Sequence, residues 1–143
     1  MTSAEHSALA RSLASRSIVL LKNDGVLPLA PAAKLALIGK QAKQPTVHGG
    51  GSGSVVPQHT SAPFDAISAA ISALGGGGSV AYDDGSDPAR AAALAARADV
   101  ALVFVATSSS EGSDRGSLSL DNGALVLARA SVGRHEPRLQ CMY

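Results

Sequence analysis

The sequence predicts an α/β fold, a layered sandwich with a mainly parallel sheet flanked by helices. Helical and extended patterns alternate in the order helix, strand, helix, strand, helix, strand, which is typical of layered α/β domains. The last expected strand, at residues 100–105, is continuously apolar. Such a run indicates burial on both faces, as in a parallel sheet covered by helices. A length of 143 residues with 45% apolar residues suits one globular domain.

The first half of the chain is expected to contain one helix and one strand. A capping box opens a helix at about residues 3–16, and a short buried run at 18–21 leads into a turn at 22–25. Residues 34–39 are apolar and end in glycine, which predicts a core strand. Residues 40–61 are rich in Gly, Ser and Pro. That composition predicts a loop.

The second half is expected to contain two helices, each followed by a strand. Ser61 as N-cap, Pro63 in the first turn and Gly75 as a stop signal bound the first of these helices. A short strand follows at 80–82. An Asp-Pro pair then opens an Ala-rich helix that runs to about Ala98, before the strand at 100–105.

Composition excludes several classes of function. With 12 basic and 11 acidic side chains, nothing favours nucleic acid or an anionic membrane as a partner. No apolar run reaches the roughly 18 residues that cross a bilayer, and the N-terminus has no signal-peptide pattern, so we expect a soluble, uncleaved chain. The single cysteine, Cys141, allows no internal disulfide and no thiolate zinc cluster. We expect no metal and no cofactor.

Aromatic side chains are scarce, which bears on carbohydrate binding. The chain has two Phe, two Tyr and no Trp. Sugar subsites commonly use an aromatic ring as a stacking platform, and the only candidates here are Phe64, Tyr82, Phe104 and Tyr143. A complete sugar site is difficult to build from these four residues.

One of the three glutamates follows a core strand. Glu5 belongs to the capping box and Glu136 to a polar tail, whereas Glu111 lies in the loop after residues 100–105. Loops at the carboxyl ends of strands are where open α/β sheets carry their chemistry. With Gly112 allowing another group to approach, Glu111 could act as a general acid or base if burial raised its pKa. The alternative is a solvated loop glutamate.

Asp114 and Arg115 follow Glu111 closely. Adjacent opposite charges on an exposed turn indicate an ion pair or a clamp that orders the loop. Three residues span at most roughly 10 Å, so Asp114 could also lie at the separation of paired glycosidase carboxylates from Glu111. Both interpretations remain open at this point.

The second loop at a strand end contains the run 49–53, which has four glycines and one serine. It lacks the lysine of a P-loop and the spacing of a dinucleotide site. It is either a flexible surface loop or a backbone that approaches a ligand or a neighbouring domain. His48 and His59 flank it without other ligands at metal spacing, so they are expected to be polar loop residues.

Five groups of residues, in this order, resemble the second domain of family 3 glycoside hydrolases. They are residues 10–11 with 17–23 and 27–29, then 35–39, 49–53, 98–100, and 111–115 with 118–120. The resemblance covers roughly residues 5–128. In that family a (β/α)8 barrel supplies an aspartate nucleophile, and the following α/β sandwich contributes the acid/base glutamate on a loop.

The resemblance assigns roles to particular residues. It implies that Glu111 is the acid/base, which would protonate the leaving aglycone oxygen and then activate water in a retaining mechanism. Asp114 and Arg115 would shape its loop. Lys22 and Asn23 would line or support the interface with the barrel, as would the glycine-rich loop with Gly50, Gly51 and Ser52, where close backbone approach would explain the glycines.

The resemblance also implies that the sandwich is truncated. Residues 1–17 would be a linker helix from a missing barrel, 18–128 a partial C-terminal domain, and 129–143 an atypical tail. Without tryptophan, no Ser-Asp-Trp nucleophile signature can be present. The chain alone is therefore expected to be inactive.

Three functional hypotheses follow. The first is a fragment of a retaining, β-glucosidase-like hydrolase whose substrate is a β-glucoside or oligosaccharide and whose activity needs the barrel. The second is a non-catalytic carbohydrate-binding or interaction module with the same fold. The third is a nucleotide-binding α/β domain. The compartment is left open, although family members are often secreted or periplasmic.

Overall fold

The computed structural model describes residues 3–21, 23 and 25–120. Three helices and three strands alternate in the predicted order: α1 (Ala4–Ser17), β1 (Lys34–Ile38), α2 (Pro63–Ala73), β2 (Ser79–Asp83), α3 (Pro88–Ala95) and β3 (Val100–Val103). Two short 3-10 helices, η1 (Lys40–Ala42) and η2 (Gly51–Gly53), lie between β1 and α2. The alternation and the α/β fold class are confirmed.

The sheet is parallel, with β1 in the centre and the order β2-β1-β3. In this register Leu37 is paired with Tyr82 on one side and Leu102 on the other. All four residues of β3 are buried, as its continuous apolar run predicts. The strand ends at Val103, two residues before the predicted end.

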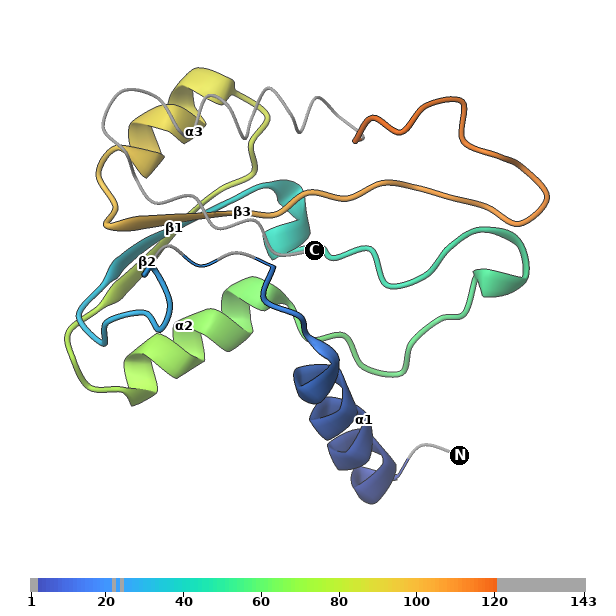
Figure 1. The fold of residues 1–143 in the computed structure, drawn as a ribbon, viewed down its shortest axis with the longest axis horizontal. Coiled ribbons are helices and arrows are strands. Elements are labelled where there is room, and N and C mark those ends of the chain that lie inside the picture. The colour runs from blue at the N-terminus through green and yellow to red at the C-terminus, as the bar shows by residue number, and fades with distance from the viewer. Residues whose placement is uncertain (1–2, 22, 24, 121–143) are drawn as a thin grey trace.

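Two helices cover opposite faces of the sheet (Figure 1). Alternate side chains of β1 point to opposite faces, so Leu35 and Leu37 pack with Ile71 of α2, whereas Ala36 and Ile38 pack with alanines of α3. Four of the six buried residues on the α3 side are alanines, and the other two are Ile38 and Val103. The many alanines of this chain thus contribute to the layer between α3 and the sheet.

The helix caps differ in detail from the predicted ones. The Ser3 hydroxyl accepts a hydrogen bond from the His6 N–H, so Ser3 is the N-cap of α1. The N-cap of α2 is Ala62, without a side-chain bond, so the prediction of Ser61 was wrong by one residue. Asp87 caps α3 through bonds from Ala89 and Arg90, and α3 ends at Ala95 rather than about Ala98.

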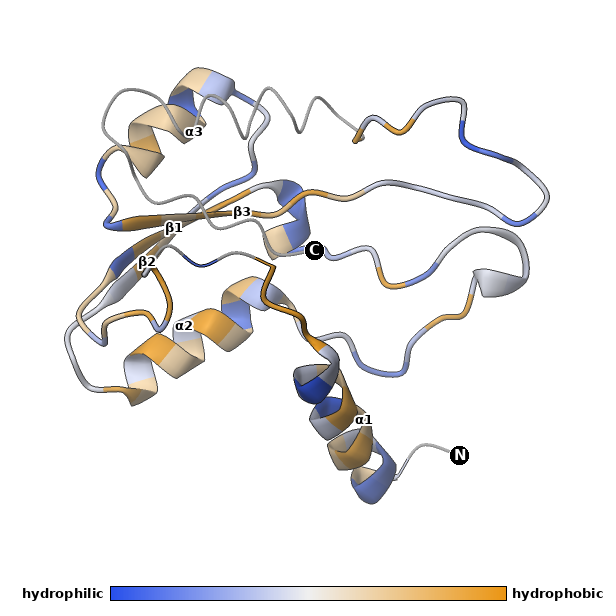
Figure 2. Cartoon of the chain, in the orientation of Figure 1, coloured by the Kyte–Doolittle hydropathy of each residue, from blue (hydrophilic) through white to orange (hydrophobic). Residues whose placement is uncertain are grey.

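The segment at residues 18–21 was predicted to be buried, and that prediction was wrong. Its four apolar side chains are 54–77% exposed. They continue an exposed apolar side of α1, which has no buried residue and extends away from the sheet (Figures 1 and 2). An apolar run indicates that a surface will be covered, but it does not say by which part of a protein.

Candidate functional site

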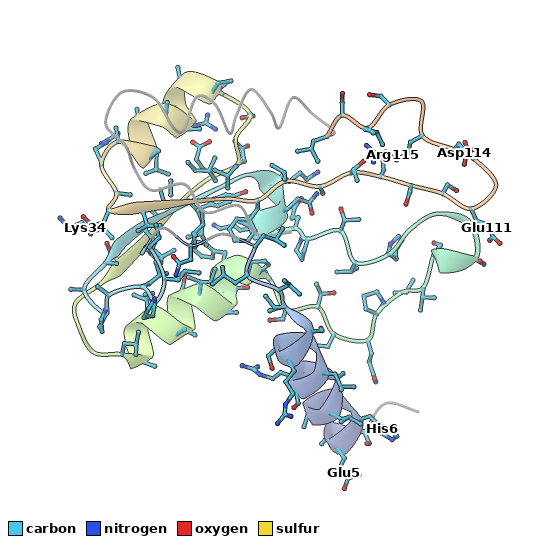
Figure 3. All side chains as sticks on the ribbon, viewed as in Figure 1. Glu5, His6, Lys34, Glu111, Asp114 and Arg115 are labelled. Atoms are coloured by element: carbon cyan, nitrogen blue, oxygen red, sulfur yellow. The ribbon has the colours of Figure 1, made fainter. Side chains whose placement is uncertain are left out.

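The two loops predicted to carry chemistry meet beyond the carboxyl ends of β1 and β3. Because these strands are neighbours and parallel, the segments that follow them leave the sheet at the same edge. Figure 1 shows the two excursions, residues 43–62 and 104–120, projecting together from that edge. Glu111 lies at the outer end of the second excursion (Figure 3).

Backbone contacts join the two loops at Gly50. Its N–H donates to the Ser109 carbonyl oxygen at 3.0 Å, and its own carbonyl accepts from the Glu111 N–H at 3.5 Å. Gly50 and Ser110 form an isolated parallel bridge. A Cβ on Gly50 would lie 2.5 Å from the Ser110 hydroxyl oxygen. The glycine-rich run is therefore a contact surface for the Glu111 loop within this same chain.

The Glu111 side chain is exposed but is held by a hydrogen bond. The Ser52 N–H donates to its Oε2 at 2.8 Å. The neighbouring Ser52 hydroxyl, and then the backbone N–H, hold the pKa of Glu111 below its ordinary value, because groups that donate to a carboxylate favour the charged form. The condition set for acid catalysis, a pKa raised by burial, is therefore not met in the chain by itself.

Gly112 lies beside open space. No heavy atom of the described residues lies within 4 Å of the position that its Cβ would occupy. The approach of a group from elsewhere stays a prediction. Its φ is +74°, a conformation that side-chain-bearing residues rarely adopt. The turn geometry after Glu111 is the reason for glycine at this position.

Asp114 and Arg115 are exposed and do not form the predicted ion pair. Within the part of the chain that the structure describes, ion pairs involve Arg90 and not Arg115. The Arg115 guanidinium donates instead to the Ser119 carbonyl oxygen at 2.5 Å, across four residues. Arg115 thus ties its own loop, and Asp114 lies on the same excursion (Figure 3).

Comparison with known proteins identifies the family. Residues 18–137 match the glycosyl hydrolase family 3 C-terminal domain. The chain belongs to this family. The match runs past residue 128, where the resemblance seen in the sequence ends. The division of the chain into three segments remains a prediction.

Relatives and solved structures agree with that assignment. A probable beta-glucosidase L of Emericella nidulans is 32% identical over 168 aligned positions, covering 100% of this chain and 22% of the relative. A beta-glucosidase of Rhizobium radiobacter is 46% identical over 70 residues, covering 48% of this chain and 9% of the relative. Two beta-glucosidase structures superpose well: one from Chaetomella raphigera (TM-score 0.80, 30% identity, 90% of this chain and 21% of that one) and the family 3 enzyme of Bifidobacterium adolescentis (TM-score 0.79, 29% identity, 99% and 22%). The chain spans about a fifth of the length of these structures.

The Lys22-Asn23 turn is seen in part. Lys22 lies outside the described residues. The Asn23 carboxamide oxygen accepts from the N–H groups of Val26 and Leu27 at 3.0 Å each, and its Nδ2 donates to the Leu27 carbonyl at 2.8 Å. In this family 3 domain Asn23 therefore orders its own turn, and a contact with a barrel stays a prediction.

Sequence reasoning missed a charged cluster at the end of β2. Asp83 is buried and forms an ion pair with Arg90 of α3, whose Nη2 also lies 2.6 Å from the Asp84 carboxylate. Arg90 lowers the pKa of Asp83 by hydrogen bonding, despite an opposing effect of burial. Asp83 and Arg90 are seven residues apart, with a turn and a helix start between them. No local sequence pattern predicts a contact at this spacing. The cluster joins α3 to the sheet.

The described aromatic residues pack against the core. Phe64 and Tyr82 meet edge to face at 5.8 Å between ring centroids. The Lys43 ammonium lies 4.3 Å and 4.4 Å from the two centroids, at cation–π distance. Both rings, like that of Phe104, are half-buried against the α2-side core. Tyr143 lies outside the described residues.

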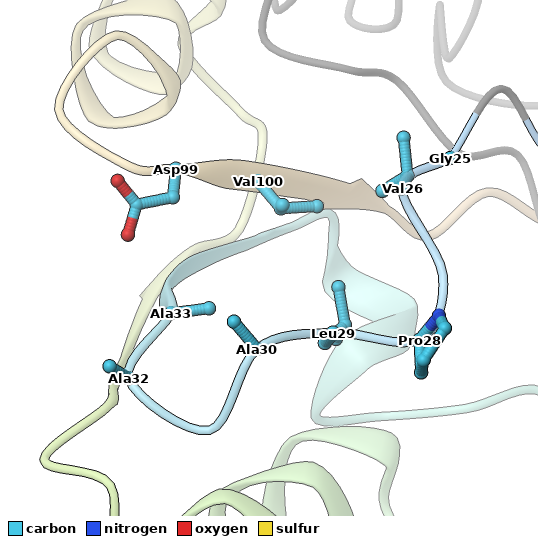
Figure 4. Close-up of a pocket in the computed structure, with 9 residues that line it drawn as sticks. All are labelled: Gly25, Val26, Pro28, Leu29, Ala30, Ala32, Ala33, Asp99 and Val100. Carbon is cyan, nitrogen blue, oxygen red and sulfur yellow. The ribbon is translucent and has the colours of Figure 1, made fainter.

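An apolar pocket lies at the opposite end of the strands from Glu111 (Figure 4). Its volume is about 360 Å³, and it is formed where the segment before β1 passes the first residue of β3. The residues that line it are Gly25, Val26, Pro28, Leu29, Ala30, Ala32, Ala33, Asp99 and Val100. Among the described residues no group of three or more His, Cys, Asp or Glu side chains could hold a metal ion. No described helix is long and apolar enough to cross a membrane.

Proposed function

We propose that this chain is the part of a β-glucosidase-like family 3 glycoside hydrolase that supplies the acid/base Glu111. The active site would be completed by a (β/α)8 barrel that carries an aspartate nucleophile. The observation that carries the proposal is the position of Glu111, exposed at the outer end of a loop that follows a core strand and is braced by a second loop. A side chain so placed can enter a neighbouring domain's site.

The chemistry is that of a retaining glycosidase. Glu111 in its acid form gives a proton to the glycosidic oxygen while the bond to the anomeric carbon breaks and the barrel aspartate forms an ester with that carbon. Ionised Glu111 then takes a proton from the water that attacks the anomeric carbon, and the ester bond breaks to regenerate the aspartate. Each residue returns to its starting state.

The first step needs Glu111 protonated, whereas hydrogen bonds from Ser52 favour the carboxylate in the chain by itself. A barrel docked over this loop would remove water from the carboxyl group, and desolvation raises the pKa of an acid. A substrate and a barrel aspartate nearby would act in the same direction. Docking of the barrel would thus both complete the active site and raise the pKa of Glu111.

Surface composition supports a protein partner. The exposed apolar residues Leu9 and Leu13 of α1, with residues 18–21 after it, make up an apolar band at the N-terminal part of the chain; Figure 2 shows apolar residues along this part of the ribbon. Exposed apolar residues that lie together mark protein interfaces. We assign this band to the barrel. Asp114 and Arg115 would shape the loop rim, and Lys22 and Asn23 would face the barrel at the turn.

The decisive experiment supplies the barrel. We expect the purified chain alone to leave an aryl β-glucoside intact, and a mixture or fusion with the barrel of a family 3 relative to hydrolyse it. The Glu111→Gln variant of the fusion should lose about 10²- to 10⁴-fold in kcat/KM. Asp114→Asn, from the same loop, is the matched control and should lose much less.

A comparison of two leaving groups distinguishes an acid/base role of Glu111 from a purely positional role. An aglycone that is a strongly acidic phenol departs without protonation, so Glu111→Gln should slow its release far less than that of an alkyl aglycone. An equal loss of kcat/KM for both aglycones would show that Glu111 does not act as the acid. Turnover by the chain alone would overturn its dependence on a barrel.

The alternative of a non-catalytic carbohydrate module has less support. The three aromatic side chains within the described residues, Phe64, Tyr82 and Phe104, are half-buried and pack against the core. The Lys43 ammonium lies over the rings of Phe64 and Tyr82. Calorimetry of the chain against glucose and cello-oligosaccharides tests this alternative. Measurable heat with an inactive barrel fusion would favour it over the catalytic proposal.

A further inference from the structure

The contacts between Glu111 and the glycine-rich loop do more than hold two loops together, because they fix the position of one residue. Two of them lock the backbone on either side of Ser110: the Gly50 N–H donates to the Ser109 carbonyl at 3.0 Å, and the Glu111 N–H donates to the Gly50 carbonyl at 3.5 Å. The point from which the Glu111 side chain leaves the backbone is therefore tied to Gly50.

The space beside Glu111 exists because residue 51 has no side chain. A Cβ on Gly51 would lie 2.6 Å from the Glu111 Cβ and 3.1 Å from its Oε2. Gly51 also has a φ of +66°, which side-chain-bearing residues rarely adopt. Steric contact and backbone conformation both require glycine at this position, and both affect the same glutamate.

The carboxylate of Glu111 is held by Ser52. Its Oε2 accepts the Ser52 N–H at 2.8 Å. The Ser52 hydroxyl also acts on this carboxylate and lowers the pKa of Glu111. The side chain is thus anchored to the glycine-rich loop as well as the backbone.

We infer that residues 50–52 form a clamp that fixes Glu111 through Oε2. This assignment makes Gly51 and Ser52 positioning residues for Glu111. An approach of the same loop to the barrel stays a prediction. The clamp is a property of this chain, whereas its value for catalysis rests on the proposed function.

The clamp is tested by NMR on the full chain, without barrel or substrate. The chain has three glutamates, so ¹³C-labelled glutamate gives three carboxyl signals, and Glu111→Gln assigns the one of interest. In the unmodified chain the Ser52 amide proton should shift with the same midpoint as the Glu111 carboxyl. That shift should vanish in Glu111→Gln. A Ser52 amide that does not follow Glu111 overturns the clamp, whatever the other variants do.

Two glycines of the same loop provide a matched pair of variants. Gly51→Ala should raise the pKa of Glu111 toward its ordinary value and speed exchange of the Ser52 amide by about 3- to 10-fold, as expected for loss of one exposed hydrogen bond. Gly53→Ala should change neither, because nothing lies within 4 Å of a Cβ there. Unchanged amide signals of β1 and β3 show that the sheet stays folded.

Equal effects of Gly51→Ala and Gly53→Ala would also overturn the clamp, since loop composition alone would then explain them. The outcomes separate this inference from the proposed function. If the barrel fusion proves inactive while the Ser52 amide follows Glu111, the clamp stands and the hydrolase proposal falls. If the fusion is active and the amide does not follow Glu111, the hydrolase proposal stands and the clamp falls.

Discussion

Two regions of the molecule differ in how they bury apolar residues. One is the sheet with α2 and α3, and the other is the N-terminal segment with α1. Leu37, in the central strand, is fully buried, whereas Leu13, on α1, is 58% exposed. The sheet buries its apolar residues between its own helices, on both faces. The helix α1 and residues 18–21 contain no buried residue.

This difference separates what the chain stabilises by itself from what it offers to a partner. Apolar burial is the main favourable contribution to folding, and here the three-stranded layer supplies it. The apolar band on α1 gains that contribution only when another surface covers it. One leucine-to-alanine substitution in each region makes the comparison quantitative.

The largest effect is expected in the central strand. Leu37→Ala removes a fully buried side chain between β2 and β3, and truncation of a buried leucine leaves a cavity as well as losing apolar burial. The free energy of unfolding should fall by about 2–5 kcal/mol, measured by urea denaturation of the full chain. A loss no greater than that of Leu13→Ala would contradict the division into two regions.

The next largest effect should come from the cluster that joins α3 to the sheet. Asp83→Asn breaks a pair in which Asp83 is 7% exposed and Arg90 is 55% exposed. Because solvent already screens Arg90, we expect a loss of about 1–2 kcal/mol, below that of a fully buried pair. Asp84→Asn is the matched control, since Asp84 is half-exposed beside the same guanidinium. Equal losses for both would assign the effect to net charge.

Low pH should weaken the contact between α3 and the sheet and so lower the free energy of unfolding. The pKa of Asp83 is lower in the folded chain than its ordinary value of 3.8, chiefly because of its hydrogen bond with Arg90. The unfolded chain therefore binds this proton first as the pH falls, so the stabilisation present above about pH 4 is lost through the folded-state pKa. Stability measured from pH 6 to 2 should fall more steeply in the unmodified chain than in Asp83→Asn. Parallel curves would show that other carboxylates dominate.

The smallest effect on stability is expected on α1. Leu13→Ala shortens an exposed side chain without opening a cavity, so the free energy of unfolding should change by no more than about 0.5 kcal/mol. The same substitution should weaken binding of a family 3 barrel, measured by calorimetry. Unchanged barrel binding would move the interface away from the α1 band.

Local patterns in the sequence were sufficient for the elements of the fold. The apolar run of β3, the Asp-Pro start of α3 and the loop position of Glu111 each depend on residues close together in the chain. The ends of elements were predicted less closely. The N-cap of α2 is Ala62, which makes no side-chain hydrogen bond, so no polar residue marks this helix start.

The candidate site was predicted only in part, because its contacts are non-local. Fifty-nine residues separate Ser52 from the Glu111 carboxylate that it holds, and no local pattern joins them. The glycines were predicted to permit a close approach, but the group that approaches is the Glu111 loop of the same chain. The prediction that residues 18–21 are buried in this chain was wrong for a related reason. Hydropathy cannot distinguish a residue of the core from a residue of an interface.

The sequence by itself determined the family, the parallel α/β layer and the choice of Glu111 among three glutamates, because these depend on composition, periodicity and ordered motifs. Only the tertiary structure decided that Gly50, Gly51 and Ser52 lie against Glu111 and that hydrogen bonds from Ser52 lower its pKa. The physical reason is the strand order: β1 and β3 are neighbours in a parallel sheet. Their loops therefore meet at one edge, and a backbone N–H from one comes within hydrogen-bond distance of a side chain from the other.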